Sequence, residues 1–139
     1  MPVACLTRVV RFQASHRYFR PDWSAERNVE AFGDAARDHA HTYHCQVTVR
    51  GTPDPVTGMV MDLGLLDRVL NEEIVERFDG RHLNLDVPEF AYGRTVPTGE
   101  MLALHVWHRV APRLSAGCTL SVVRVQEDPM LWAEYRGDA

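Results

Sequence analysis

Three histidines in this chain have the type and the spacing to hold a metal ion. His39 and His41 are separated by one residue, in a run whose odd positions from Tyr43 onward are mostly apolar and whose even positions are polar. This alternation predicts a half-buried strand, whose side chains point to opposite faces in turn. Both imidazoles then share the face of Val47 and Val49, where two imidazoles two residues apart can bind one ion.

A third imidazole ends the strand that we predict at residues 6–16. Val10, Phe12 and Ala14 fall on one face of this strand together with His16, and polar side chains occupy the other face. A single histidine at a strand end is more often a capped polar residue than a ligand. Three histidines on matching faces of two strands favour a metal instead. Three neutral imidazoles are the ligand set of an open catalytic zinc site, in which water or substrate oxygens fill the other positions.

Composition sets the broad class of the protein. With 139 residues, of which 45% are hydrophobic and 24% charged, the sequence predicts a single domain, residues 1–139, with its own core. The net charge of −4 gives no reason to expect nucleic acid or an anionic membrane as a partner. Three cysteines without CxxC spacing favour reduced thiols and a cytoplasmic location. Neither a signal peptide nor a membrane-spanning apolar run is evident.

The elements that must position the histidines follow in the order strand, strand, helix, helix, strand, strand. Ser24, Asp62 and Thr98 are the expected helix N-caps, because each precedes an apolar-periodic segment. This order predicts an α+β fold, a four-stranded antiparallel sheet with two helices on one face. We expect strands at residues 6–16, 39–50, 118–127 and 130–135, a short helix at 24–32, long helices at 62–78 and 99–114, and an irregular loop at 81–96.

Short motifs spread over nearly the whole chain carry a resemblance to a known family. They are FQASHR at 12–17, HAHTY at 39–43, DPVTGMVMD at 54–62, DVP at 86–88 and PTGE at 97–100. With these motifs the chain resembles the family of 6-pyruvoyltetrahydropterin synthase and 6-carboxytetrahydropterin synthase. The resemblance implies a T-fold, whose sheets join around a barrel in a trimer. Two trimers then stack as a hexamer, with the active sites between subunits.

The same resemblance implies roles for particular residues. Zinc is expected on His16, His39 and His41, and a pterin ring is expected on the carboxylate of Glu127. A carboxylate suits this role, because a pterin presents adjacent N–H groups that it can accept as a pair. Without the resemblance, Glu127 would be taken for a surface charge at a strand end. Additional contacts to the ring are expected near Thr98 and Glu100.

Two positions depart from the family pattern. The family's usual cysteine, which helps to move protons at the substrate side chain, corresponds to Ala35. Its paired aspartate and histidine correspond to Asp79 and Gly80, so the aspartate remains and the histidine is missing. His82 substitutes for it only if the loop bends to bring it back. Other candidates for proton transfer are Asp34, Asp38 and His44. The chain thus keeps the metal ligands and the ring anchor but lacks two of three groups for acid–base work.

Three functions remain open on these observations. The first is a zinc-dependent lyase or isomerase that acts on dihydroneopterin triphosphate or a related pterin, with altered or reduced chemistry. The second is a catalytically silent zinc protein that binds a pterin. The third, a zinc-stabilised structural oligomer, is disfavoured by the retained carboxylate and ligand histidines. Between the first two, the sequence modestly favours the enzyme. A protein that only binds a pterin does not need a three-histidine metal site with free coordination positions.

Overall fold

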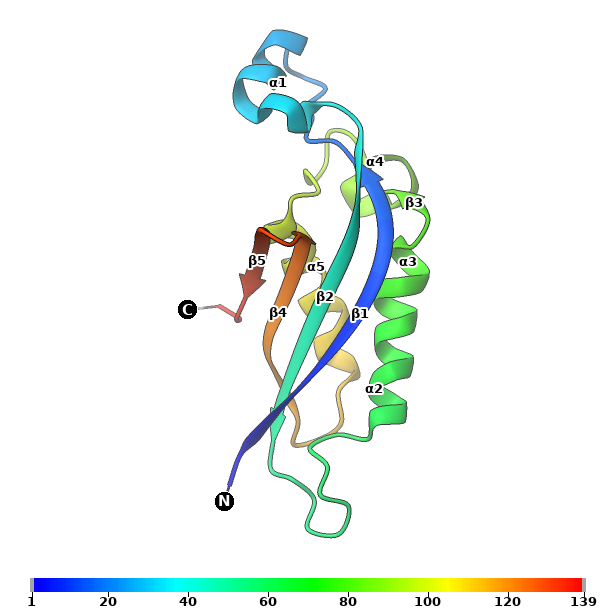
Figure 1. Ribbon diagram of the computed structural model, residues 1–139, viewed down its shortest axis with the longest axis vertical. Helices are drawn as coiled ribbons and strands as arrows, with labels where there is room; N and C mark the ends of the chain where they lie inside the picture. The colour runs from blue at the N-terminus through cyan, green and yellow to red at the C-terminus, as the bar shows by residue number, and fades with distance from the viewer. Residues whose placement is uncertain (1, 139) are drawn as a thin grey trace.

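The computed structural model describes residues 2–138 and shows a long, twisted sheet with helices packed along one face (Figure 1). The predicted domain, 1–139, also includes Met1 and Ala139, which lie outside the described residues. The strand order across the sheet is β3-β1-β2-β4-β5. The strands are β1 (Ala4–His16), β2 (His39–Gly51), β3 (Arg81–His82), β4 (Thr119–Asp128) and β5 (Leu131–Tyr135).

The expected four-stranded antiparallel sheet is correct for the long strands, but a fifth, two-residue strand makes the sheet mixed. β3 runs parallel to β1, pairing with Ala14 and Ser15, inside the segment 81–96 that the sequence predicts as a loop. Gly80 donates its N–H to the carbonyl of Gln13 at 2.7 Å, and this contact leads the chain onto the edge of β1. Two residues are too few to produce a recognisable alternation, so the sequence alone does not reveal β3.

The predicted helix starts are confirmed by their caps. The carboxylate of Asp62 accepts the N–H of Leu65 at 3.0 Å, and the hydroxyl of Thr98 accepts that of Met101 at 3.1 Å. The long second helix is continuous but contains a π-helical turn at Asn71–Val75. The α-helices are α1 (Ala25–Phe32), α2 (Leu63–Leu70), α3 (Glu76–Phe78), α4 (Leu83–Asp86) and α5 (Gly99–Val110).

One hydrophobic core joins the helices to a single face of the sheet. The alternate β2 residues Tyr43, Cys45, Val47 and Val49 are all fully buried, as their alternation predicts. They pack against apolar side chains of α2, α3 and α5. The ladder between β1 and β2 holds one register throughout, so the face of every side chain along it is fixed. Within the described residues, no helix is both long and apolar enough to cross a membrane.

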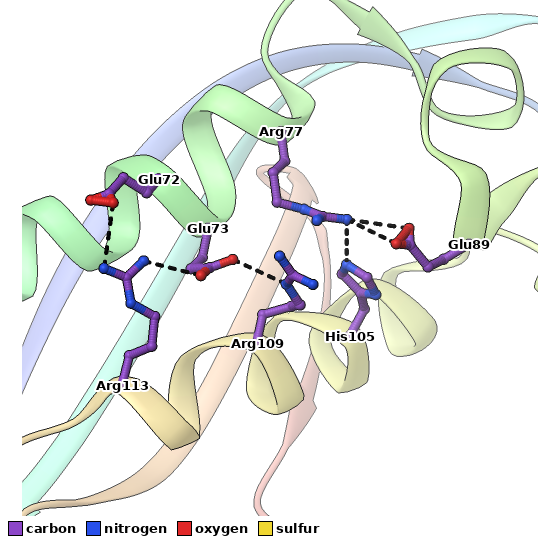
Figure 2. Close-up of polar contacts among 7 residues, drawn as sticks. All are labelled: Glu72, Glu73, Arg77, Glu89, His105, Arg109 and Arg113. Atoms are coloured by element: carbon purple, nitrogen blue, oxygen red, sulfur yellow. Dashed lines mark hydrogen bonds and ion pairs between the residues drawn. The ribbon is translucent and has the colours of Figure 1, made fainter.

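Charged side chains link the helices to each other away from the sheet (Figure 2). Glu73 accepts from Arg109 and from Arg113, each at 3.0 Å, while Arg77 contacts Glu89 at 3.2 Å. We call this group the helix cluster. It consists of Glu72, Glu73, Arg77, Glu89, His105, Arg109 and Arg113.

Candidate metal and ligand site

The pairing of β1 with β2 brings the three predicted histidines together. His16 lies directly opposite His39, and His41 lies opposite the small side chain of Ala14. All three imidazoles therefore leave the same face of the ladder. They belong to the end of β1 and the start of β2, the end of the sheet that lies nearest α1 in Figure 1. Their ring centroids are separated by 4.5, 4.9 and 5.2 Å. One nitrogen of each ring lies within 4.8 Å of the other two, which is a cluster able to hold a metal ion.

Backbone carbonyls orient two of the rings. Nδ1 of His16 lies 2.9 Å from the carbonyl of Pro97, and Nδ1 of His39 lies 2.7 Å from that of Arg37. A carbonyl oxygen only accepts, so each Nδ1 donates its proton and each Nε2 keeps a lone pair. Such outer hydrogen bonds are typical of histidines that ligate a metal, because they fix both the tautomer and the ring.

The third ring presents an unsatisfied nitrogen. Nε2 of His41 is buried and has no hydrogen-bond partner among residues 2–138, and its nearest charged neighbour is Oε2 of Glu127 at 3.8 Å. A buried polar atom without a partner is uncommon and calls for an explanation. A cation between the rings would satisfy it. The donor set of three nitrogens fits zinc.

Burial favours the neutral, metal-ligating form of two of the three imidazoles, His16 and His41. Burial, followed by the neighbouring His39 and His41, lowers the pKa of His16 to about 3. Burial also lowers the pKa of His41, although the charge of Glu127 opposes this effect. A histidine must be neutral to ligate a metal, so His16 and His41 do not have to lose a proton near neutral pH before they bind an ion.

Glu127 is buried beside the histidines, with 6% of its surface exposed. Its Oε1 accepts a hydrogen bond from the hydroxyl of Tyr18 at 3.0 Å. The backbone at Gly99, in the first turn of α5, approaches so closely that a Cβ there would lie 3.5 Å from Oε1. The N-terminal, positive end of the α5 dipole thus faces the carboxylate. A surface position, which the strand pattern alone indicates, is wrong for Glu127.

The other two predicted ligand contacts lie at the same helix end. Thr98 uses its hydroxyl to cap α5, so it holds the helix start in place. Glu100 is exposed and lines a cavity of about 30 Å³ together with Glu127 and Trp132. A second cavity, of about 310 Å³, lies between Glu127 and the histidines His39 and His41, and both Asp34 and Ala35 line it.

Asp79 and His82 have different hydrogen-bond partners. Oδ1 of Asp79 accepts the backbone N–H of Gln13 at 2.9 Å, which holds it at the outer edge of β1. Nε2 of His82 lies 2.7 Å from Oδ1 of Asp38. Within one subunit, the carboxylate in contact with His82 is therefore that of Asp38, while the carboxylate of Asp79 contacts the backbone of β1. Nδ1 of His82 is buried without a partner within the described part of the chain.

Sequence reasoning missed two tyrosines. Tyr18 has the parity of His16 two residues earlier, and this spacing is the signal that could have placed it at the site. The hydroxyl of Tyr43 lies 3.1 Å from Nδ1 and 3.3 Å from Nε2 of His16, although the alternation of β2 indicates only a core residue. Asp38 was one of several candidates, and only the meeting of β1, β2 and β3 singles it out.

Comparison with known proteins agrees with this geometry. Residues 5–138 match the family model of 6-pyruvoyl tetrahydropterin synthase. The chain is similar to 6-pyruvoyl tetrahydrobiopterin synthase from Poecilia reticulata, with 38% identity over 98% of this chain and 92% of the relative. For the Homo sapiens protein of the same name the identity is 36%, over 97% and 92%. The solved structure of Caenorhabditis elegans 6-pyruvoyl tetrahydropterin synthase superposes with a TM-score of 0.91 at 32% identity, covering 99% of this chain and 98% of that one. The expected T-fold is confirmed.

Proposed function

Because the chain belongs to the 6-pyruvoyl tetrahydropterin synthase family, we propose that it is a zinc-dependent lyase or isomerase acting on dihydroneopterin triphosphate or a related pterin. Its chemistry is altered or reduced relative to the family reaction. The observation that carries this proposal is the convergence of three histidine nitrogens beside the buried carboxylate of Glu127. One site then offers a metal for the substrate side chain and an acceptor for the ring.

His16, His39 and His41 hold the zinc ion in this proposal. When bound, zinc supplies Lewis acidity to the side-chain oxygens of the substrate and lowers the pKa of neighbouring C–H and O–H groups. The carbonyl contacts at Nδ1 of His16 and His39 keep both rings aimed at the ion. The ion would also provide the partner that Nε2 of His41 lacks among the described residues.

Glu127 anchors the pterin ring by accepting its adjacent N–H groups as a pair. Burial makes the pairing selective, because a ligand without these donors leaves a carboxylate desolvated and unpaired. Thr98 contributes by fixing the start of α5, and Glu100 reaches the same ring cavity from the first turn.

Proton transfer is assigned to His82 and Asp79. His82 carries a carboxylate partner, Asp38, as a general acid or base requires for a fixed orientation. Asp79 faces outward into a cavity of about 300 Å³ that Arg11 and Thr42 also line. From there it serves the site of a neighbouring subunit and not its own.

The assembly that this requires is a homo-trimer or a hexamer with active sites between subunits. Both edges of the sheet favour it, since β5 forms one edge and β3 covers only Ala14 and Ser15 of β1 at the other. Closing the sheets of several copies into a barrel removes both edges. The three free cysteines accord with the cytoplasmic location proposed for this enzyme.

The direct test is turnover of dihydroneopterin triphosphate by zinc-loaded protein, with products identified by mass spectrometry. We expect 6-pyruvoyl- or 6-carboxytetrahydropterin to form very slowly or not at all, because one positioned acid–base group contributes ~10²–10⁴-fold and two are missing. Slow retro-aldol cleavage or epimerisation of the side chain is the expected residual activity. Ala35→Cys, alone and with Gly80→His, should raise the family reaction.

Two further results separate an active enzyme from a protein that only binds a pterin. If unaltered protein runs the family reaction at an ordinary rate, His82→Ala should stop it. A second candidate function, silent pterin binding, is favoured by Ala35, which lines the cavity of His39 and His41 and has no proton to give. Tight pterin binding without any conversion, even after Ala35→Cys, supports that candidate and contradicts the enzyme.

A further inference from the structure

Tyr18 lies between the two cavities beside Glu127, and none of the roles assigned above accounts for it. It lines both the cavity of about 30 Å³ and that of about 310 Å³. Its backbone N–H donates to the carbonyl of Ala35 at 2.8 Å, and its ring packs edge-on against His16 and Phe32. The tyrosine is thus held in place on several sides, with its hydroxyl directed at Oε1 of Glu127.

The cavity on the Tyr18 side of the Glu127 carboxylate is small. The cavity that Glu127 shares with Gly99 and Trp132 measures about 30 Å³, whereas pockets for small molecules measure roughly 300–1,000 Å³. A bicyclic ring therefore does not fit into this cavity, on the Oε1 side of Glu127, while Tyr18 keeps this position. The adjoining cavity is ten times larger, so moving the phenol would join the ring site to the metal site.

Both oxygens of the carboxylate already face protein groups. Oε1 is bonded to Tyr18, and Oε2 faces Nε2 of His41 at 3.8 Å. A carboxylate oxygen only accepts, so the hydroxyl of Tyr18 is the donor in this hydrogen bond. Because a buried carboxylate without donors is costly, this hydrogen bond stabilises the closed arrangement.

We propose that Tyr18 is a displaceable plug, which competes with the ring N–H groups of the ligand for Glu127. The inference rests on the proposed pterin function and adds a selectivity device to it. A ligand with two adjacent donors replaces the lost tyrosine bond and adds a second one. A ligand with a single donor only exchanges one bond for another and gains nothing from opening the site.

Tyr18→Phe tests this proposal, since it keeps the ring and removes the hydroxyl. The measurement is the affinity of zinc-loaded protein for pterin itself, which has the ring without the side chain, by fluorescence titration and stopped flow. We expect binding to tighten roughly tenfold, mainly through faster association, because a hydrogen bond to a charged acceptor no longer has to break. Tyr92→Phe is the matched control, because Tyr92 packs on Phe19 away from Glu127, and it should leave the affinity unchanged.

Every outcome separates the plug from other roles. Weaker binding in Tyr18→Phe would mean that the hydroxyl holds the ligand or aligns Glu127, and unchanged binding would mean that it does not compete. Either result overturns the plug while leaving pterin binding in place. Binding of pterin by none of the proteins, despite normal zinc content and thermal unfolding, overturns the proposed function and this inference together.

Discussion

Two regions of the molecule contain buried or half-buried histidines with lowered pKa values, and they differ in what surrounds the ring nitrogens. In the helix cluster, burial and then Arg77 lower the pKa of His105 to about 4. Arg77 donates to Nε2 of His105 at 3.2 Å, so this nitrogen is satisfied within the protein (Figure 2). In the cluster of His16, His39 and His41, Nε2 of His41 has no such partner among the described residues and lies close to a nitrogen of each of the other two imidazoles.

The contrast shows that a lowered histidine pKa reports burial and not function. What distinguishes the cluster of His16, His39 and His41 is that one nitrogen of each ring lies within reach of a single ion and that Nε2 of His41 has no donor among the described residues. Nε of Arg77 is also buried without a partner in the described chain, but a guanidinium nitrogen only donates and cannot bind a cation. We expect substitutions in the two regions to have separable effects.

Metal content should show the largest difference between the regions. Purified protein should carry about one zinc per chain, and His39→Ala should abolish it, because two remaining imidazoles do not hold the ion. The paired variant in the helix cluster, His105→Ala, should retain full zinc. Elemental analysis of both proteins checks this, and a full complement of zinc in His39→Ala would remove the assignment of the ligands.

The free energy of unfolding should depend on the charged contacts of the helix cluster. Glu73→Gln deprives Arg109 and Arg113 of a mostly buried charged partner, whose side chain is 13% exposed. The free energy of unfolding should fall by about 1–3 kcal/mol, as expected for losing charge-assisted hydrogen bonds. Asp22→Asn breaks an exposed pair with Arg20 and should leave the free energy of unfolding almost unchanged, because solvent screens the pair. Urea unfolding measures both, and equal losses would contradict the distinction.

Acid should weaken the fold through His105. The folded state lowers its pKa from 6.5 to about 4, so between these pH values the unfolded chain binds a proton that the folded chain does not. Stability from this group is complete above pH 6.5 and is lost as the pH falls towards 4. His105→Gln, which still accepts from Arg77 but cannot be protonated, should remove about 1 kcal/mol of the loss between pH 7 and 5, allowing for partial exposure. His108→Gln, on the exposed side of α5, serves as control, and identical pH dependence in all three proteins would exclude this role.

The difference between the regions also explains what the sequence could predict. Alternation along β1 and β2 fixes the face of His16, His39 and His41, and an antiparallel ladder without a bulge then brings them together. This part depends on local patterns. The caps at Asp62 and Thr98 are local in the same way.

Contacts between distant segments leave no such pattern. His82 meets Asp38 across 44 residues and Tyr18 meets Glu127 across 109, so neither pair could be read from spacing. The contact of Asp79 with the backbone N–H of Gln13, 66 residues away in the sequence, could not be read from spacing either. A backbone partner places no demand on side-chain type and therefore leaves no trace in the sequence.

The central claim is that a pterin ring binds at the buried carboxylate of Glu127, beside the three histidines. Titration of pterin into zinc-loaded Glu127→Gln tests this claim most directly. This change keeps the shape but replaces one acceptor by a donor that faces the ring N–H groups. Affinity should weaken by roughly 1.5–3 kcal/mol, as for a charge-assisted hydrogen bond. Glu73→Gln, the same substitution in the helix cluster, should bind pterin as the unaltered protein does. Equal pterin affinity in all three proteins would contradict the account.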